Sequence, residues 1–149
     1  MPEQNAPQQS FEKHAQLVPM YHGVLFLIIV ATLIGSLVNL SHSFDDPSRH
    51  YNAALLVTVS LALVLLFWFA RIFALKAQDR AIRAEENLRH FVLTGKLIDP
   101  RVTIQQVIAL RFAPDAEFPA LAAKAAAEGT AAKEIKRSIK NWRADTYRV

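Results

Sequence analysis

The sequence predicts an all-α membrane protein: a two-helix transmembrane hairpin whose second helix extends into the cytoplasm and is followed by a small helical C-terminal region. Two apolar stretches, residues 24–40 and 53–70, contain no acidic residue, lysine or arginine. At a rise of about 1.5 Å per residue, a helix of either length approaches the roughly 30 Å hydrocarbon core of a bilayer. The rest of the chain shows helix caps and helical spacing, and no strand alternation of useful length.

Residues 1–19 form a polar N-terminal tail. Its first ten residues contain two prolines and no apolar cluster, a composition typical of disordered segments. A secretory signal peptide begins with a basic segment and a short apolar run, and ends at a small-residue cleavage site. The tail does not follow this pattern, so we expect the first span to be retained.

The predicted hairpin covers residues 20–71, with spans at about 22–41 and 53–71. The segment between the spans is polar and contains Pro47, a residue type that favours turns. No proline or glycine occurs in residues 53–94, so we expect the second helix to continue as a cytoplasmic extension over 72–95. Gly95 is the expected C-terminal cap of this helix.

The distribution of charge predicts the orientation in the membrane. Residues 1–52 carry two basic and four acidic side chains, and residues 53–149 carry fifteen and nine. Five arginines and lysines lie within residues 71–89, directly after the second span, whereas the loop between the spans contains only Arg49. By the positive-inside rule, the chain lies in the bacterial inner (cytoplasmic) membrane with both termini in the cytoplasm.

Small and polar residues predict the faces on which the two spans pack. Small residues let helices approach closely in lipid, and polar side chains can form hydrogen bonds across the interface. The predicted packing residues are Thr32, Gly35, Ser36 and Asn39 in the first span and Ala54, Thr58 and Ala62 in the second. The alternative is that this face docks a third helix.

A small three-helix cytoplasmic region is predicted over residues 103–149. Thr103 and Gln106 match a capping box, so the first helix begins there and runs to about residue 112, before Pro114. A single core of fewer than about 70 residues rarely supplies more than about 3–5 kcal/mol. We therefore expect this region to need support from the preceding helix, the membrane surface or a partner.

The second helix of this region is expected to begin near residue 115 and to end at Gly129. The third begins with Thr130 as its cap. It carries one apolar stripe, formed by Ile135, Ile139 and Trp142 at helical spacing.

The third helix is also basic. The residues predicted to dock a partner or lipid are Lys133, Lys136, Arg137, Lys140, Trp142 and Arg143. Near an anionic bilayer, each basic residue contributes about 1 kcal/mol to binding. The expected partners are therefore other membrane-protein subunits and the anionic head groups of the cytoplasmic leaflet.

A helix-turn-helix is the alternative interpretation of the same segment, with Gly129 in the turn and a basic helix after it. Ala125 and Ile135 lie roughly where that motif needs apolar residues. Lys124, Glu128 and Ser138 occupy positions that the motif would turn toward its core. Nucleic acid is therefore not the favoured partner.

The sequence offers no catalytic constellation. The four glycines are isolated, which excludes a glycine-rich phosphate loop, and the absence of cysteine excludes thiolate chemistry. Neither span contains a mid-membrane acid or base of the kind that marks an ion pathway. We expect no enzyme activity, no cofactor and no metal. The alternative is a metal site in the loop between the spans, formed by His42, Asp45, Asp46 and His50.

Three sequence blocks carry a resemblance to a known family: ARIFALKAQDRAIRAEENLR, IALRFAPDAEFPAL and KEIKRSIKNWRADTYRV. In this order they resemble an uncharacterised bacterial family of two-span membrane proteins, over roughly residues 14–149. Some members of that family carry the label of ABC transporter permease. The resemblance implies an architecture and transfers no functional residue.

The function that fits these observations is that of a non-catalytic structural or assembly subunit. It would bridge components of a larger bacterial membrane complex, such as a respiratory or photosynthetic assembly. The alternatives are a membrane-tethered helix-turn-helix-like DNA-binding protein and an accessory subunit of a transporter.

Overall fold

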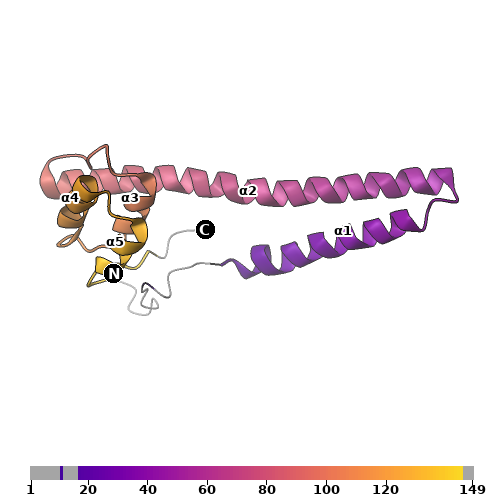
Figure 1. The fold of residues 1–149 in the computed structure, drawn as a ribbon, viewed down its shortest axis with the longest axis horizontal. Coiled ribbons are helices and arrows are strands. Elements are labelled where there is room, and N and C mark those ends of the chain that lie inside the picture. Colours follow the sequence, from indigo (N-terminus) through magenta and orange to yellow (C-terminus); the bar gives the residue numbers. More distant parts are fainter. Residues whose placement is uncertain (1–10, 12–16, 146–149) are drawn as a thin grey trace. The chain divides into compact units, whose positions relative to one another are not determined.

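The computed structural model describes residue 11 and residues 17–145. In this part of the chain every regular element is a helix and there is no strand, which confirms the predicted all-α class (Figure 1). The elements are a π-helix, η1 (Met20–Leu25), followed by α1 (Phe26–Ser41), α2 (Pro47–Thr94), α3 (Ile104–Leu110), α4 (Phe118–Glu128) and α5 (Ala132–Ser138). Most of the predicted tail, residues 1–19, lies outside the described residues. The chain divides into two compact units, one over residues 17–75 and one that includes residues 76–145.

Two helices are long and apolar enough to cross a membrane: the continuous helix Met20–Ser41, and α2. Their apolar side chains are mostly exposed; Leu27, Val59, Leu66 and Trp68 are each at least half exposed. Side chains of this kind are usually withdrawn from water, and soluble proteins rarely expose them over large contiguous patches. The predicted pair of apolar helices is therefore present.

In the first unit, η1 and α2 meet through aromatic side chains. The rings of Tyr21 and Phe67 stack with centroids 4.4 Å apart and planes 12° apart. The Tyr21 hydroxyl also donates a hydrogen bond to the carbonyl oxygen of Phe67. The buried positions of this unit recur at intervals of seven; they are Ile29, Ser36 and Ser43, and on α2 Ala53 and Ser60. A seven-residue repeat is typical of helices that pack side by side.

The seven predicted packing residues differ in their exposure. Of the seven predicted residues, Ser36 is buried and Ala54 is half-buried, whereas Thr32, Gly35, Asn39, Thr58 and Ala62 are exposed. A Cβ atom added at Gly35 would meet nothing within 4 Å. The predicted residues of the second span, 54, 58 and 62, are spaced by four, and such a row drifts around a helix of 3.6 residues per turn. The half-buried residues 33, 40, 57 and 64 lie between the buried ones, so the less exposed positions alternate steps of three and four, the spacing that keeps a face aligned with its neighbour.

Helix α2 begins at Pro47, about one and a half turns before the expected start of the second span. The Asp46 carboxylate accepts hydrogen bonds from the backbone N–H groups of Ser48 and Arg49, at 3.0 and 3.4 Å, and so caps the helix. Proline in the first turn sacrifices no helical hydrogen bond. Pro47 therefore starts a helix here, where the sequence alone suggested a turn.

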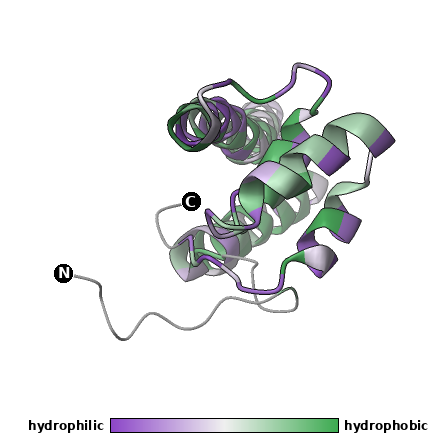
Figure 2. Ribbon diagram, turned by 90° about the vertical axis from the view of Figure 1, so that its left-hand side faces the viewer, coloured by the Kyte–Doolittle hydropathy of each residue, from purple (hydrophilic) through white to green (hydrophobic). Residues whose placement is uncertain are grey.

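In the second unit, α3, α4 and α5 gather around the last turns of α2 (Figure 1). Hydrophobic and hydrophilic residues are interleaved along these short helices (Figure 2). Ile82 of α2 joins a buried core whose largest fully buried side chains are Phe112, Phe118, Leu110, Ile135, Val102 and Val107. The last part of α2 thus supplies the support that the short C-terminal helices were expected to need.

The caps at Thr103, Gly95 and Gly129 follow the sequence, whereas the predicted cap Thr130 does not: the N-cap of α5 is Ala131, without a side-chain hydrogen bond. Thr103 and Gln106 form the predicted capping box. The Gln106 side chain also donates to the carbonyl oxygen of Thr130 at 2.9 Å, which ties the start of α3 to the connection between α4 and α5. Gly95 and Gly129 end α2 and α4 with φ angles of +73° and +64°, the left-handed conformation that favours glycine.

Helix α5 is shorter than predicted, because it ends at Ser138 and the chain continues in extended conformation at Ile139. Competing hydrogen bonds explain the early end. The Glu117 carboxylate accepts the backbone N–H groups of Lys140 and Asn141, at 3.0 and 3.2 Å. These bonds replace the helical ones that the apolar stripe had led us to expect.

Candidate functional site

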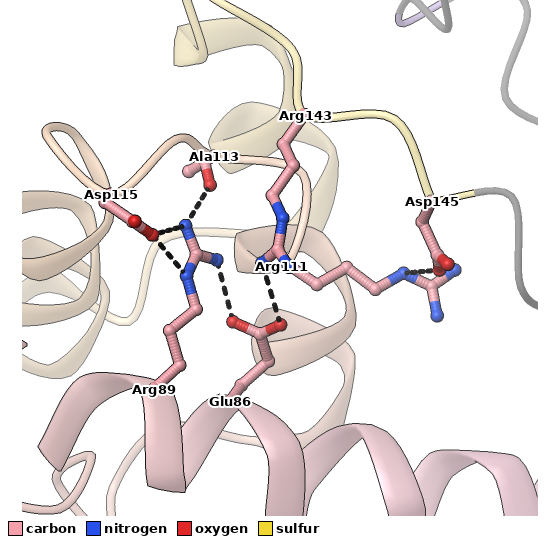
Figure 3. A network of polar contacts seen from close by, with 7 residues as sticks. All are labelled: Glu86, Arg89, Arg111, Ala113, Asp115, Arg143 and Asp145. Atoms are coloured by element: carbon pink, nitrogen blue, oxygen red, sulfur yellow. Dashed lines mark hydrogen bonds and ion pairs between the residues drawn. The ribbon is translucent and has the colours of Figure 1, made fainter. Parts of the chain in front are cut away.

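An ionic network centred on Glu86 and Arg89 of α2 is the most concentrated polar feature of the second unit (Figure 3). Their side chains are 8% and 12% exposed and form an ion pair of 2.9 Å. Arg89 also binds the Asp115 carboxylate and the Ala113 carbonyl oxygen, both at 2.7 Å. Its guanidinium lies 4.5 Å from the centre of the Phe118 ring. Arg89 therefore joins α2 to the chain between α3 and α4.

A second part of the network holds the segment 143–145 (Figure 3). Arg143 approaches Glu86, with Nη1 3.8 Å from Oε1. Arg111, directly after α3, is buried and pairs with Asp145 at 3.2 Å. The backbone N–H of Arg143 donates to the carbonyl oxygen of Phe112 at 2.8 Å. These bonds fasten the C-terminal segment beside α2 and the end of α3.

A pocket of about 130 Å³ adjoins this network. It is lined by Gln78, Ala81, Ile82, Glu85, Glu86, Arg111, Arg143, Ala144 and Asp145. The ion pairs of the network use three arginines and three carboxylates, so their formal charges cancel. The arrangement is suited to holding chain segments together.

Glu117, at the start of α4, fixes the same segment from another side. The backbone N–H of Lys140 is the main cause that lowers the pKa of Glu117 below its ordinary value, and the hydrogen bonds from Asn141 add to the effect. The carboxylate therefore binds the segment best when it is ionised.

The structure separates the six residues predicted to dock a partner or lipid. Lys133, Arg137 and Lys140 are exposed. Lys136 is half-buried, with its ammonium 5.5 Å from the centre of the Phe112 ring. Trp142 is half-buried and packs against Phe112, with ring centroids 4.9 Å apart. Arg143 takes part in the ionic network, so only the first three form an exposed basic surface, in which the Arg137 guanidinium lies 5.3 Å from the centre of the Phe11 ring.

Sequence reasoning missed the network. In the sequence, Glu85 stands four residues before Arg89, a spacing at which an ion pair is favourable in an isolated helix. The partners found are Glu86 and Asp115, because the fold brings the chain after α3 next to α2. The one available signal was Arg111, which stands between the apolar residues Leu110 and Phe112. A charged residue in such a position needs a buried partner.

The loop between α1 and α2 uses its polar residues locally. Asp46 caps α2, and the His50 ring lies against Phe44 with centroids 4.8 Å apart. Over residues 17–145 the structure contains no cluster of three or more histidines and carboxylates placed to hold a metal ion.

Comparison with known proteins places the chain in a family. No curated protein and no solved structure matches the chain. A family of unknown function, DUF6526, matches residues 5–149, nearly the whole length. The chain therefore belongs to DUF6526.

Proposed function

We propose that this chain is a non-catalytic structural or assembly subunit of a larger bacterial membrane complex. It would be anchored in the inner membrane as a two-helix hairpin, with both termini in the cytoplasm. The observation that carries the proposal is the contrast between its two units. Residues 17–75 expose apolar side chains, whereas residues 76–145 fold around their own core and their own balanced ion pairs.

The first unit supports the membrane location. Val59, Leu66 and Trp68 are 55%, 65% and 65% exposed, and burial of such surface stabilises by about 25 cal/mol per Å². Hydrocarbon can cover these side chains without a further protein, and a partner's transmembrane helices can do the same. Both outcomes suit a subunit that joins other membrane proteins.

The second unit supports the orientation and the bridging role. The exposed basic surface consists of Lys133 and Arg137, both on α5, and Lys140, two residues after the end of this helix. Positive charge favours the cytoplasmic side, where it also attracts anionic head groups and acidic protein surfaces. A respiratory or photosynthetic assembly is a suitable host, because such complexes include small subunits without chemistry of their own.

The proposal is tested by purifying the full chain, with an affinity tag, in a mild detergent. We expect other membrane subunits to co-purify in fixed ratio. The triple variant Lys133→Glu, Arg137→Glu and Lys140→Glu should lose them. The control variant Arg101→Glu changes an exposed arginine that pairs with Asp99 outside this surface, and it should retain them. Migration of the wild-type chain alone would contradict the proposal.

A DNA-binding role is the second candidate, favoured by the connection between α4 and α5. Ala125 and Ile135 are buried on either side of the left-handed Gly129, as a helix-turn-helix requires. Lys124 and Glu128 are exposed, which agrees less well. This candidate would be favoured if the full chain in detergent retained duplex DNA in a salt-sensitive way and the Arg137→Glu variant did not. A transporter accessory role would instead appear as co-purification of a multi-span permease.

A further inference from the structure

The outer face of α2 in the second unit is apolar although it is exposed. Ala77, Ala81, Ala84, Leu88 and Phe91 succeed one another at steps of four, three, four and three. Leu88 and Phe91 are 64% and 51% exposed, and Val92 beside them is 75% exposed. Alternating steps of three and four are the spacing of a coiled-coil seam. We call these five residues the α2 seam.

Ala84, at the centre of the α2 seam, lies opposite the face that α2 turns toward its own unit. Ile82, Glu86 and Arg89 point into the core and the ionic network. At 100° per residue, Ala84 stands about 160° around the helix from both Ile82 and Glu86. Ala84, Leu88 and Phe91 are therefore not an extension of the core. Ala81 and the neighbouring Glu85 line the mouth of the pocket beside segment 143–145, and both stay exposed there.

We infer that the α2 seam binds the same seam of a second copy of this chain in a parallel, two-fold symmetric coiled coil. The flanking charges select this occupant. With Ala77 and Ala84 as d positions and Ala81 as an a position, Arg80 is a g position and Glu85 is the e position five residues later. In a parallel dimer these two positions face each other across the interface. Arg80 of each copy would therefore pair with Glu85 of the other, which gives two ion pairs related by the two-fold axis. The same surface of both copies supplies them, as in any isologous interface.

Arg80 and Glu85 are available for this pairing. Both side chains are exposed, and neither forms an ion pair with a residue that the structure describes. The small side chains at residues 77, 81 and 84 permit close approach of two helices, and Leu88 and Phe91 add apolar contact at the end of the seam.

The inference rests on the proposed function in one respect, because insertion in one membrane makes the two copies parallel. Insertion in one membrane also allows a short seam to hold the dimer together. Two chains held in the same bilayer meet at a high effective concentration, so contacts of modest strength can keep them together.

Disulfide cross-linking tests this dimer, since the natural chain contains no cysteine. Ala84→Cys, at a d position, should yield a covalent dimer of the full chain when membranes are oxidised. Lys76→Cys is the matched control: it is exposed on the same helix but lies at a c position, away from the axis. It should remain monomeric. Equal yields from the two variants, no dimer from Ala84→Cys, or a product that contains another protein would overturn the inference.

Charge reversal tests the pairing itself. In the Ala84→Cys background, Arg80→Glu or Glu85→Arg alone should reduce the dimer yield to the level of the control, because like charges then face each other. The double variant should restore the yield. A double variant as weak as either single variant would contradict the parallel arrangement. Carbonate extraction of the same membranes reports insertion separately, so failure of the dimer is distinguishable from failure of the membrane proposal.

Discussion

Glu86 and Arg89 form an ion pair of 2.9 Å one turn apart on α2, and both side chains are almost completely withdrawn from solvent. A buried carboxylate that loses its partner keeps the cost of its desolvation. The pair is therefore expected to contribute more to stability than ion pairs at the surface do.

We predict that Arg89→Met destabilises the second unit by about 3 kcal/mol, because it leaves the buried Glu86 carboxylate with only the more distant Arg143, at 3.8 Å, and also removes the bonds to Asp115 and Ala113. The measurement is urea unfolding of the full chain in detergent, followed by the fluorescence of Trp142 in a Trp68→Phe background. Arg101→Met is the control. It breaks an exposed pair with Asp99, so it should cost less than about 1 kcal/mol. Equal effects of the two substitutions would refute the importance of burial.

The left-handed conformation of Gly129 gives a second prediction. A Cβ atom at this position would meet nothing within 4 Å, so Gly129→Ala tests the backbone conformation alone, at φ +64°. We expect a loss of about 1 kcal/mol in the same urea experiment.

Gly35→Ala is the matched control for this substitution. Gly35 also has open space around it, but it lies inside α1 without a positive φ. Alanine is favoured over glycine in a helix by about 0.5–1 kcal/mol, so this variant should not be destabilised. A Gly129→Ala variant as stable as the natural chain would show that α4 does not end in the left-handed conformation.

The hydrogen bonds of Glu117 predict a pH-dependent release of the C-terminal segment. These hydrogen bonds, first of all the one from the Lys140 backbone N–H, lower the folded-state pKa of Glu117 below its ordinary value. The stabilisation is therefore complete above that ordinary value and is lost as the pH falls through the folded-state pKa. Trp142, directly after Asn141, should report the release as a change in fluorescence between neutral and acidic pH in the Trp68→Phe background.

Glu117→Gln should show the released signal already at neutral pH and no acid transition of this kind. Asp99 provides the contrast, because Arg101 lowers its pKa to about 2 and it stays ionised over most of this range. An unchanged acid transition in Glu117→Gln would assign the effect to another group.

The buried face between α1 and α2 predicts opposite outcomes for two neighbouring positions. Ser60 is 3% exposed, so Ser60→Leu should overpack the interface and cost about 1–3 kcal/mol. Thr58 is exposed, and Thr58→Leu should change stability by less than about 0.5 kcal/mol. Unfolding by sodium dodecyl sulfate in mixed micelles, followed by Trp68 in a Trp142→Phe background, measures both. A larger loss of stability from Thr58→Leu than from Ser60→Leu would instead support the packing face predicted from residue size.

The sequence predicts well those features that depend on local chemistry. The all-α class, the two apolar helices, the capping box at Thr103 and the glycine caps at residues 95 and 129 are all present. Each of these follows from hydrophobicity over a window of residues or from a conformational preference within a few residues.

Features set by tertiary contacts could not be predicted in the same way. The packing register of α1 depends on which face meets α2, and several faces offer small residues. The early end of α5 depends on Glu117, 23 residues before Lys140 in the chain. Arg89 and Arg111 find partners that only the folded chain brings near. Local patterns carry no information on such encounters.

The central claim is that a bilayer surrounds the apolar helices and that the basic unit lies in the cytoplasm. Cysteine accessibility tests it most directly, because the natural chain contains no cysteine. Single variants Asp45→Cys, Val59→Cys and Lys133→Cys are treated with a membrane-impermeant maleimide. In spheroplasts only Asp45→Cys should react, in inside-out vesicles only Lys133→Cys, and Val59→Cys in neither. Reaction of Val59→Cys as fast as the other two would contradict the membrane location, and reaction of Lys133→Cys in spheroplasts would contradict the orientation.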